Sequence, residues 1–279
     1  MILENTIRKA SIVLRNNNIS SHQLDAEIIL SNIMGVSREF LLTKNDLYLN
    51  DDIIKKFNYA IQRRIKNEPV AYIVGQREFW DENFIVNYTT LVPRPDTELL
   101  IYKTVNFFKN KSIRILDIGT GSGCILLSLL KELKLSKGTG IDISPKAIKT
   151  AVINSKKMNL INRSIFKVSD IKDFFSKKYD LIVSNPPYIP YSNLKNLSND
   201  IRDYEPLIAL NGGIDGLDLI KKVIYKSNTL LKRGGLLAIE IGNHQYIKVS
   251  SILKQNGYRE IGKEFDYNHN VRCIISTKM

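Results

Sequence analysis

One short stretch of the chain, Asn185-Pro186-Pro187-Tyr188, places a carboxamide, two prolines and an aromatic ring directly after the apolar run 179–183. The side-chain oxygen of Asn185 and the carbonyl of Pro186 can each accept a hydrogen bond, so together they can hold a planar NH2 group by its two hydrogens. Consecutive prolines fix φ and carry no N–H, so these carbonyls are not expected to join a regular strand ladder. We interpret Asn185, Pro186 and Tyr188 as catalytic and all four residues as substrate-binding, with Tyr188 supplying a flat face. The tetrapeptide is equally compatible with a strand that ends in a Pro-Pro turn beside a buried tyrosine.

A glycine-rich stretch upstream of this tetrapeptide suits a nucleotide. Residues 117–123, with the sequence DIGTGSG, follow an apolar run and precede an expected helix. Doubly wound folds bind nucleotides at this point, where glycines let a ligand approach the backbone. The spacing G-x-G-x-G meets the dinucleotide fingerprint only in part. The cofactor-binding residues predicted here are Gly119, Thr120, Gly121, Ser122 and Gly123.

Later residues complete the predicted nucleotide site. Asp142 ends the next strand, about 20 residues beyond the glycine stretch, where a carboxylate can bind both ribose hydroxyls. Asp170 and Ile171 follow the third strand; the carboxylate can accept from the exocyclic amine of an adenine, and Ile171 can pack on its ring. We also assign Asn185, after the fourth strand, to the cofactor site. A dehydrogenase would share this constellation, but it needs an acid or base near a nicotinamide, and none of the three histidines lies in a recognisable catalytic pattern.

The composition is that of a globular chain. With 279 residues, 43% of them hydrophobic, the chain is long enough for two cores. Its net charge of +13 fits a polyanionic partner such as RNA, or a general preference for lysine with no binding face. Cys124 and Cys273 lack the spacing of a metal site or disulfide framework, so we expect no metal and a reducing compartment. Early charges after Met1 and the lack of an apolar run of about 18 residues predict a cytoplasmic protein without a membrane segment.

The elements that must position these residues fall into three parts. Helical periodicity dominates residues 1–75, which we assign as a small N-terminal helical bundle for substrate recognition. The sequence of residues 76–92 predicts a strand, a turn and a second strand, which we expect to form a β-hairpin linker. Prolines end the hairpin, and Asp96 or Thr97 is expected either to cap the helix 98–108 or to form part of the wall between cofactor and substrate.

From residue 112 onward the chain alternates strand and helix, which is typical of a doubly wound α/β sheet. A long polar loop is expected between Pro190 and Gly216, and long loops at the carboxyl end of a strand are often functional. The strands are predicted at 113–117, 139–143, 164–168, 180–184, 236–241 and 272–276, and the intervening helices at 122–133, 145–158, 217–231 and 245–255.

The glycine stretch, Asp142 and the Asn-Pro-Pro-Tyr tetrapeptide together resemble the seven-stranded S-adenosylmethionine-dependent methyltransferases. The resemblance implies a doubly wound seven-stranded methyltransferase sheet in residues 93–279, after the helical bundle, with S-adenosylmethionine as cofactor. Stretches similar to the release factor glutamine methyltransferases are EPVAYIVG at 68–75, PRPDTE at 93–98, YEP at 204–206 with Ala209 and Leu210, GGIDGL at 212–217, and EIG at 240–242 with Gln245. Members of that family usually have Gly where this chain has Asn268, and Asn also tolerates positive φ.

This resemblance implies methylation of the N5 amide nitrogen of the glutamine in the Gly-Gly-Gln motif of class-I peptide chain release factors. We expect a monomer that requires no nucleic acid. A glutamine methyltransferase acting on a ribosomal protein is the nearest alternative. An adenine-N6 DNA methyltransferase would share the pocket, but it usually requires a target-recognition region that we do not find. A non-catalytic RNA-binding or ribosome-binding module is the third alternative.

Overall fold

The computed structural model describes residues 1–44 and 46–279. Among these residues, no helix combines the length and the apolar character that crossing a membrane requires. The described chain separates into two compact units. The first comprises Met1–Gln76 and Ser198–Tyr204, and the second comprises Arg77–Leu197 and Glu205–Met279.

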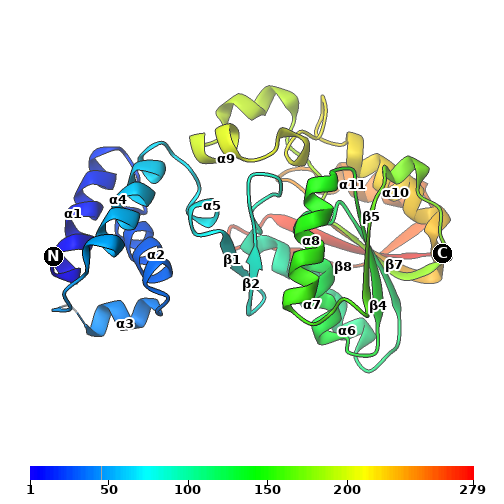
Figure 1. Cartoon of the computed structure of the whole chain (residues 1–279). Helices are drawn as coiled ribbons and strands as arrows, with labels where there is room; N and C mark the ends of the chain where they lie inside the picture. Colours follow the sequence, from blue (N-terminus) through cyan, green and yellow to red (C-terminus); the bar gives the residue numbers. More distant parts are fainter. Residues whose placement is uncertain (45) are drawn as a thin grey trace. The chain divides into compact units, whose positions relative to one another are not determined.

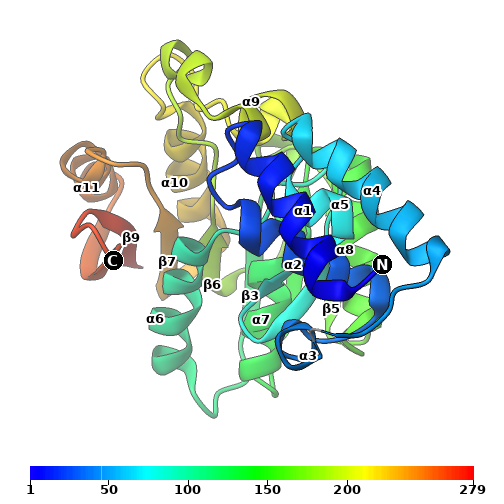
Figure 2. The same ribbon diagram turned by 90° about the vertical axis from the view of Figure 1, so that its left-hand side faces the viewer.

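The first unit is helical. Its elements are α1 (Leu3–Asn16), α2 (His22–Met34), α3 (Arg38–Thr43), α4 (Asp51–Ile65), α5 (Val70–Val74) and α9 (Asn199–Tyr204). The Asn50 side chain caps α4 by accepting from the Ile53 amide, and Gly35 ends α2 in the left-handed conformation that favours glycine. Apolar stripes of α1, α2 and α4, which lie alongside one another, form a common core (Figure 2). A buried ion pair joins two of these helices, from Arg64 Nε to Asp25 Oδ2 over 2.7 Å.

The second unit contains a hairpin and a seven-stranded sheet, which confirms the predicted fold class. Five of the six predicted strands match the observed ones to within two residues at each end. The strand predicted at 236–241 begins earlier, and β8 was missed because its burial does not alternate strictly. The hairpin strands are β1 (Gln76–Phe79) and β2 (Glu82–Ile85), and the sheet strands are β3 (Arg114–Ile118), β4 (Lys137–Asp142), β5 (Ser164–Val168), β6 (Tyr179–Ser184), β7 (Leu231–Glu240), β8 (Tyr258–Phe265) and β9 (Val271–Lys278).

The strand order of the sheet is β5-β4-β3-β6-β7-β9-β8, and Figure 2 shows β5, β3, β6, β7 and β9 following one another across the sheet. β9 runs antiparallel to both of its neighbours, β7 and β8, and the pairs from β5 to β7 are parallel. The order reverses between β3 and β6, and doubly wound sheets bind ligands in the crevice outside the carboxyl ends of strands at such a reversal. The fold therefore locates the site before any side chain is considered.

Alternating residues of the central strands face two separate cores. Ile115 of β3 and Leu181 of β6 belong to the core that includes α6 and α7, whereas Leu116 and Ile182, one position later, belong to the core that includes α10 and α11. This period of two places helices on both faces of the sheet (Figure 1). The helices of this unit are α6 (Glu98–Phe108), α7 (Cys124–Glu132), α8 (Pro145–Lys157), α10 (Asp218–Leu230) and α11 (Tyr246–Gln255).

A buried asparagine of the sheet domain forms hydrogen bonds with the backbone of the hairpin. Asn154 of α8 accepts from the Ile85 amide over 2.7 Å and donates to the Ile85 carbonyl over 3.0 Å. The same carboxamide donates to the Ser122 carbonyl in the glycine stretch over 2.9 Å. Asn154 therefore couples the position of the hairpin to that of the predicted cofactor loop.

The segment predicted as a long polar loop between Pro190 and Gly216 contains short helical elements. Besides α9, it forms two 3-10 turns, Tyr191–Asn196 and Leu207–Ala209. These turns satisfy backbone groups locally, which a loop of this length needs if it is to adopt one shape. The second turn contributes to the pocket described next.

Candidate active site

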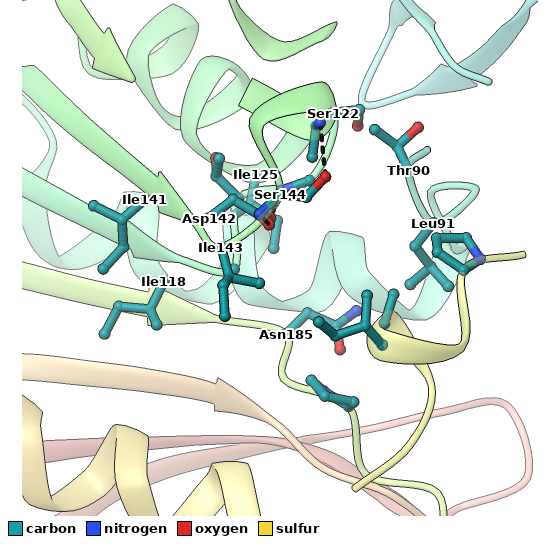
Figure 3. A pocket seen from close by; sticks show the side chains of 18 of the residues that line it. Thr90, Leu91, Ile118, Ser122, Ile125, Ile141, Asp142, Ile143, Ser144 and Asn185 are labelled. Atoms are coloured by element: carbon teal, nitrogen blue, oxygen red, sulfur yellow. Dashed lines mark hydrogen bonds between the residues drawn. The ribbon is translucent and has the colours of Figure 1, made fainter. Parts of the chain in front are cut away.

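A cavity of about 280 Å³ lies at the carboxyl ends of β3, β4 and β6 (Figure 3). Ile118 and Ser184 are register partners in neighbouring strands, so Gly119 and Asn185 leave the sheet side by side. The Ser184 hydroxyl donates to the Ile118 carbonyl over 2.8 Å and ties the two strand ends together. The predicted site residues that line the cavity are Gly119, Thr120, Gly121, Ser122, Asp142, Asp170, Ile171, Asn185 and Pro187, whereas Gly123, Pro186 and Tyr188 do not line it.

Glycine is needed in the cofactor stretch for two different structural reasons. Gly119 and Gly121 have φ values of +75° and +55°, and a Cβ added at either would meet no atom within 4 Å. Their missing side chains leave open space for a ligand against the backbone. Gly123 begins α7 with a φ of +82°, but its Cβ would lie 3.2 Å from Ala151 and Leu127. Gly123 therefore allows close packing of the helix and is not part of the cavity wall.

Asp142 is held in one orientation by the backbone. One carboxylate oxygen accepts from the Gly121 amide and the other from the Ser144 amide, each over 2.9 Å. Burial raises the pKa of Asp142, and these backbone hydrogen bonds oppose the shift. Each oxygen keeps a further lone pair for a ligand hydroxyl, so the carboxylate fits a ribose diol.

Asp117 lies behind the glycine stretch and supports it. Its Oδ2 accepts from the Thr120 hydroxyl over 2.6 Å. Complete burial raises the Asp117 pKa to about 7, and the nearby charge of Asp142 adds to the shift. Asp117 was not among the predicted site residues, although its place at the end of an apolar strand was a usable signal.

The cavity wall also includes the residues predicted to surround an adenine. Asp170 accepts from the Lys172 amide over 2.9 Å and caps a 3-10 turn that begins at Ile171. The Ile171 side chain is buried and packs against the core beneath the cavity. This end of the cavity therefore has an apolar wall with a carboxylate beside it.

Asn185 presents its two amide atoms to different surroundings. Its Nδ2 donates to the Thr97 hydroxyl over 3.0 Å. No described residue donates to its Oδ1 or to the backbone carbonyl of Pro186. Both acceptors are thus free at this strand end, but only Asn185 lines the cavity, and Pro186 does not.

One of the two interpretations of the sequence was that Thr97 caps α6. The structure does not support it. The Thr97 side chain makes no capping hydrogen bond, because the hydroxyl donates to Glu240 Oε2 over 2.7 Å. Thr97 instead lines the cavity together with Pro93 and Arg94, and Arg94 forms an ion pair with the buried Glu205 over 2.5 Å. The alternative interpretation, that this segment forms a wall of the site, agrees with its place in the structure.

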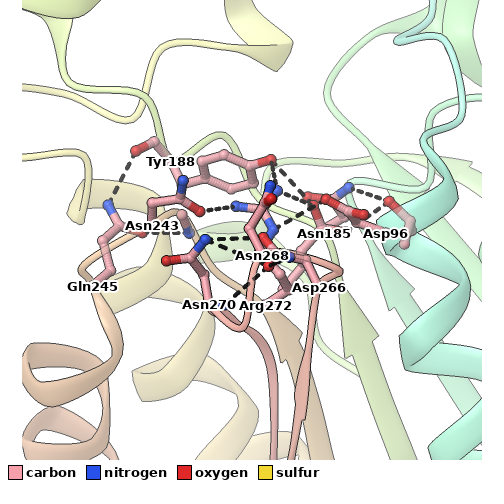
Figure 4. Close-up of polar contacts among 12 residues, drawn as sticks. Asp96, Asn185, Tyr188, Asn243, Gln245, Asp266, Asn268, Asn270 and Arg272 are labelled. Carbon is pink, nitrogen blue, oxygen red and sulfur yellow. Dashed lines mark hydrogen bonds and ion pairs between the residues drawn. The ribbon is translucent and has the colours of Figure 1, made fainter.

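Tyr188 is anchored away from the cavity. Its hydroxyl donates to Glu240 Oε1 over 3.2 Å and accepts from Arg272 Nη2 over 2.9 Å (Figure 4). The Arg272 guanidinium also lies 5.3 Å from the centre of the tyrosine ring. Gln245 donates to the Tyr188 carbonyl over 3.0 Å. Burial and the neighbouring Glu240 raise the pKa of Tyr188, so its hydroxyl stays protonated.

Glu240 and Arg272 are members of the site that sequence reasoning did not assign to it, whereas Thr97 was expected in the wall of the site by one of the two interpretations. Glu240 ends an apolar strand and is 1% exposed. Burial raises its pKa, while hydrogen bonding by Thr97 and the charge of Arg272 oppose the shift. The signal in the sequence was an acidic residue in the predicted strand 236–241, whose other residues are all apolar, because an unpaired charge is costly to bury.

The doubly wound sheet, with a glycine loop and an acidic strand end around one cavity, defines the class of nucleotide-cofactor-binding α/β enzymes. Within that class, the family model described as "Methyltransferase domain" matches residues 109–278, and the model described as "PrmC N-terminal domain" matches residues 5–75. The chain belongs to the release factor glutamine methyltransferase family.

Curated relatives extend over the whole chain. The chain is 35% identical to the release factor glutamine methyltransferase of Clostridium acetobutylicum, covering 100% of this chain and 99% of the relative. It is 36% identical to the protein of the same name from Buchnera aphidicola subsp. Acyrthosiphon pisum, covering 100% and 99%. Among solved structures, a methyltransferase from Pyrococcus furiosus matches with a TM-score of 0.54 and 17% identity, covering 82% of this chain and 99% of that one, which supports the fold alone.

Proposed function

We propose that this chain transfers a methyl group from S-adenosylmethionine to the N5 amide nitrogen of the glutamine in the Gly-Gly-Gln motif of class-I peptide chain release factors. One observation carries the proposal: the Asn185 carboxamide is held by its nitrogen, and its oxygen is free beside the glycine stretch. The names of the full-length relatives supply the substrate class. The geometry supplies a site for a planar NH2 group.

Two acceptors would bind and orient the substrate amide. An amide nitrogen is a poor nucleophile because resonance withdraws its lone pair. Asn185 Oδ1 and the Pro186 carbonyl would each accept one N–H, which fixes the nitrogen in position and aims it along one line. Placement of this kind contributes up to about 7–11 kcal/mol in ideal cases. The two carbonyl dipoles would also stabilise positive charge as it develops on the nitrogen.

The cofactor would be held by the residues of the cavity wall. When bound, S-adenosylmethionine supplies an electrophilic methyl group on a sulfonium. Asp142 would accept from both ribose hydroxyls, and Gly119 and Gly121 would let the ligand lie against the backbone. Asp170 and Ile171 would contact the adenine. The open space beside the two glycines and the preset Asp142 carboxylate support this fit.

The proton balance needs no dedicated base in the cavity wall. As the new N–C bond forms, the C–S bond breaks and the glutamine nitrogen loses one proton, which leaves to water. Asn185 cannot remove this proton, because a neutral carboxamide is not a base at physiological pH. Its part is to hold the nitrogen while transfer takes place.

Incubation of the purified chain with isotope-labelled donor tests the proposal. We expect label on a release factor and none on the same factor with its Gly-Gly-Gln glutamine replaced by alanine. Parallel incubations contain ribosomal protein and DNA. Label on either of these, with none on the release factor, would refute the substrate assignment.

We propose that the helical bundle of residues 1–75 recognises the release factor outside its glutamine. The bundle exposes large apolar side chains within a short span, including Leu42 at 55% and Tyr48 at 76% exposure. Replacing both with serine in the full chain should raise KM for the whole factor and leave transfer to a free Gly-Gly-Gln peptide unchanged. Tyr59→Ser, at a residue 69% exposed on α4, is the matched control. An equal loss on factor and peptide would contradict the docking role.

We further propose that the chain acts as a cytoplasmic monomer and requires no nucleic acid for transfer. Release factors act in translation, so enzyme and substrate would share that compartment. Nuclease treatment should leave the transfer rate unchanged, and size-exclusion chromatography should give the mass of one chain of 31.9 kDa.

A further inference from the structure

Three groups, two in the cavity wall and one behind it, form hydrogen bonds in series. Asn185 Nδ2 donates to Thr97 Oγ1 over 3.0 Å, and Thr97 Oγ1 donates to Glu240 Oε2 over 2.7 Å. Thr97 is 2% exposed and Glu240 is 1% exposed. The series therefore links the proposed substrate-binding carboxamide to a buried carboxylate that does not itself line the cavity.

The direction of each hydrogen bond in this series follows from the chemistry of its members. An ionised carboxylate can only accept, so it takes the single hydroxyl proton of Thr97. The Thr97 oxygen can then only accept from Asn185. The NH2 end of the carboxamide must face Thr97, and the oxygen end must face away from it.

Glu240 is itself fixed on its other side. Its Oε1 accepts from the Tyr188 hydroxyl over 3.2 Å and lies 3.7 Å from Arg272 Nη2. Arg272 also lies 3.4 Å from Asp96, beside Thr97 (Figure 4). A charged partner and two hydroxyl donors favour the ionised form of the carboxylate in this buried position.

We infer that Glu240, acting through the Thr97 hydroxyl, is a positioning residue that sets which end of the Asn185 carboxamide meets the substrate. The inference rests on the proposed function, because only an NH2 substrate requires an acceptor at this point. If the carboxamide turned over, its NH2 group would face the substrate NH2 group, and two donors cannot bond to each other. The hydrogen bonds of Thr97 and Glu240 thus select one of the two orientations of the Asn185 carboxamide.

Thr97→Val tests the relay, because valine keeps the shape of threonine and removes both hydrogen bonds. We expect kcat with saturating donor to fall by about 10- to 100-fold, as for displaced groups that orient a substrate. The dissociation constant of the donor should stay within about 2-fold, because Asp142 and the glycine stretch are unchanged. Thr97→Ser keeps the hydroxyl and should retain kcat to within about 3-fold.

The chain offers a matched control at Thr104 on α6. Its hydroxyl is fully buried and donates to the Leu100 backbone carbonyl, outside the cavity. Thr104→Val makes the same chemical change and should leave kcat at the wild-type value. Wild-type kcat in Thr97→Val, or an equal loss in Thr104→Val, would overturn the inference.

Glu240→Gln tests the other end of the relay. Its new NH2 group can donate to Thr97, which frees the Thr97 proton to point at Asn185 and turns the carboxamide. We expect kcat to fall while donor binding is retained, with a loss on the order of 10-fold. An unchanged kcat would contradict the assignment of Glu240.

A spectroscopic measurement separates the relay from the proposed reaction. The side-chain NH2 of Asn185 can be identified in 15N-asparagine-labelled protein by the signal that Asn185→Asp removes. It should exchange its protons slowly in wild type and in Thr97→Ser, and faster in Thr97→Val. Protection without any transfer to a release factor would refute the proposed function alone, whereas transfer without this protection would refute the relay alone.

Discussion

Removing the Asn185 carboxamide should abolish most of the transfer rate without weakening the cofactor site. In Asn185→Ala, the substrate NH2 keeps the Pro186 carbonyl and loses the second of its two acceptors. The nitrogen can then rotate about the remaining hydrogen bond. Asn185 was also assigned to the cofactor site, but the other proposed donor contacts, which follow β3, β4 and β5, are unchanged, so the dissociation constant for the donor should stay within about 3-fold.

The size of the effect follows from what the carboxamide oxygen does. It accepts one hydrogen bond from a group that gains positive charge in the transition state. Removing one preorganised dipole of this kind typically costs about 10²- to 10³-fold in kcat, or about 2.7–4 kcal/mol. A water molecule that replaced the oxygen in the cavity wall would lack its fixed orientation.

The assay is initial-rate methyl transfer to a release factor with saturating labelled donor, together with calorimetric binding of the donor. Asn193→Ala is the matched control, because Asn193 is exposed in the segment after the tetrapeptide and does not line the cavity. If Asn185→Ala retained kcat to within a few-fold, the carboxamide would not hold the substrate, and the proposed mechanism would be wrong.

Other consequences concern the cofactor site and stability. Asp142→Asn should weaken donor binding by about 10- to 100-fold in calorimetry, because its NH2 group would face a backbone N–H, either that of Gly121 or that of Ser144. Asp117→Asn should flatten the pH dependence of urea unfolding: the raised Asp117 pKa of about 7 means that folding favours its protonated form, so the contribution of Asp117 to stability is greatest below about pH 4 and falls by about 4 kcal/mol as pH rises from there through 7. An unchanged pH slope in the variant would contradict that pKa. Arg64→Ala should lower the free energy of unfolding by about 3–5 kcal/mol, because it leaves Asp25 buried without its partner; a loss below 1 kcal/mol would show that the pair contributes little.

The sequence predicted those parts of the site whose signals are local. The glycine stretch and Asp142 each follow an apolar strand, and parallel strands end at one edge of a sheet, so their meeting in one cavity was foreseeable. The tetrapeptide after β6 was foreseeable for the same reason. The sequence left open whether Asn185 binds a substrate NH2 group or only follows a strand that ends in a Pro-Pro turn. The two interpretations can now be tested, because the Asn185 oxygen is free in the cavity wall.

Contacts between distant positions could not be predicted in this way. Thr97 and Glu240 are 143 positions apart, and a threonine before a helix more often caps it than bonds to a far strand. Tyr188 was expected to offer its ring to the substrate, but Arg272, 84 positions away, holds the hydroxyl. Local propensity gives no information about such partners, because they exist only once the sheet has assembled.

Buried side chains on distant elements support the residues of the cavity wall, so the site can be both rigid and open. Asn154 holds the glycine stretch from α8, and Glu240 of β7 would hold the Asn185 carboxamide through the Thr97 hydroxyl. Both supports are buried polar side chains on regular elements, whose positions are fixed by packing. The atoms facing the cavity can therefore remain unbonded without moving. If catalysis here is mainly placement, substitutions at the supports should lower kcat while the cavity still binds its donor, and a support variant that lost donor affinity and rate in proportion would contradict this division of labour.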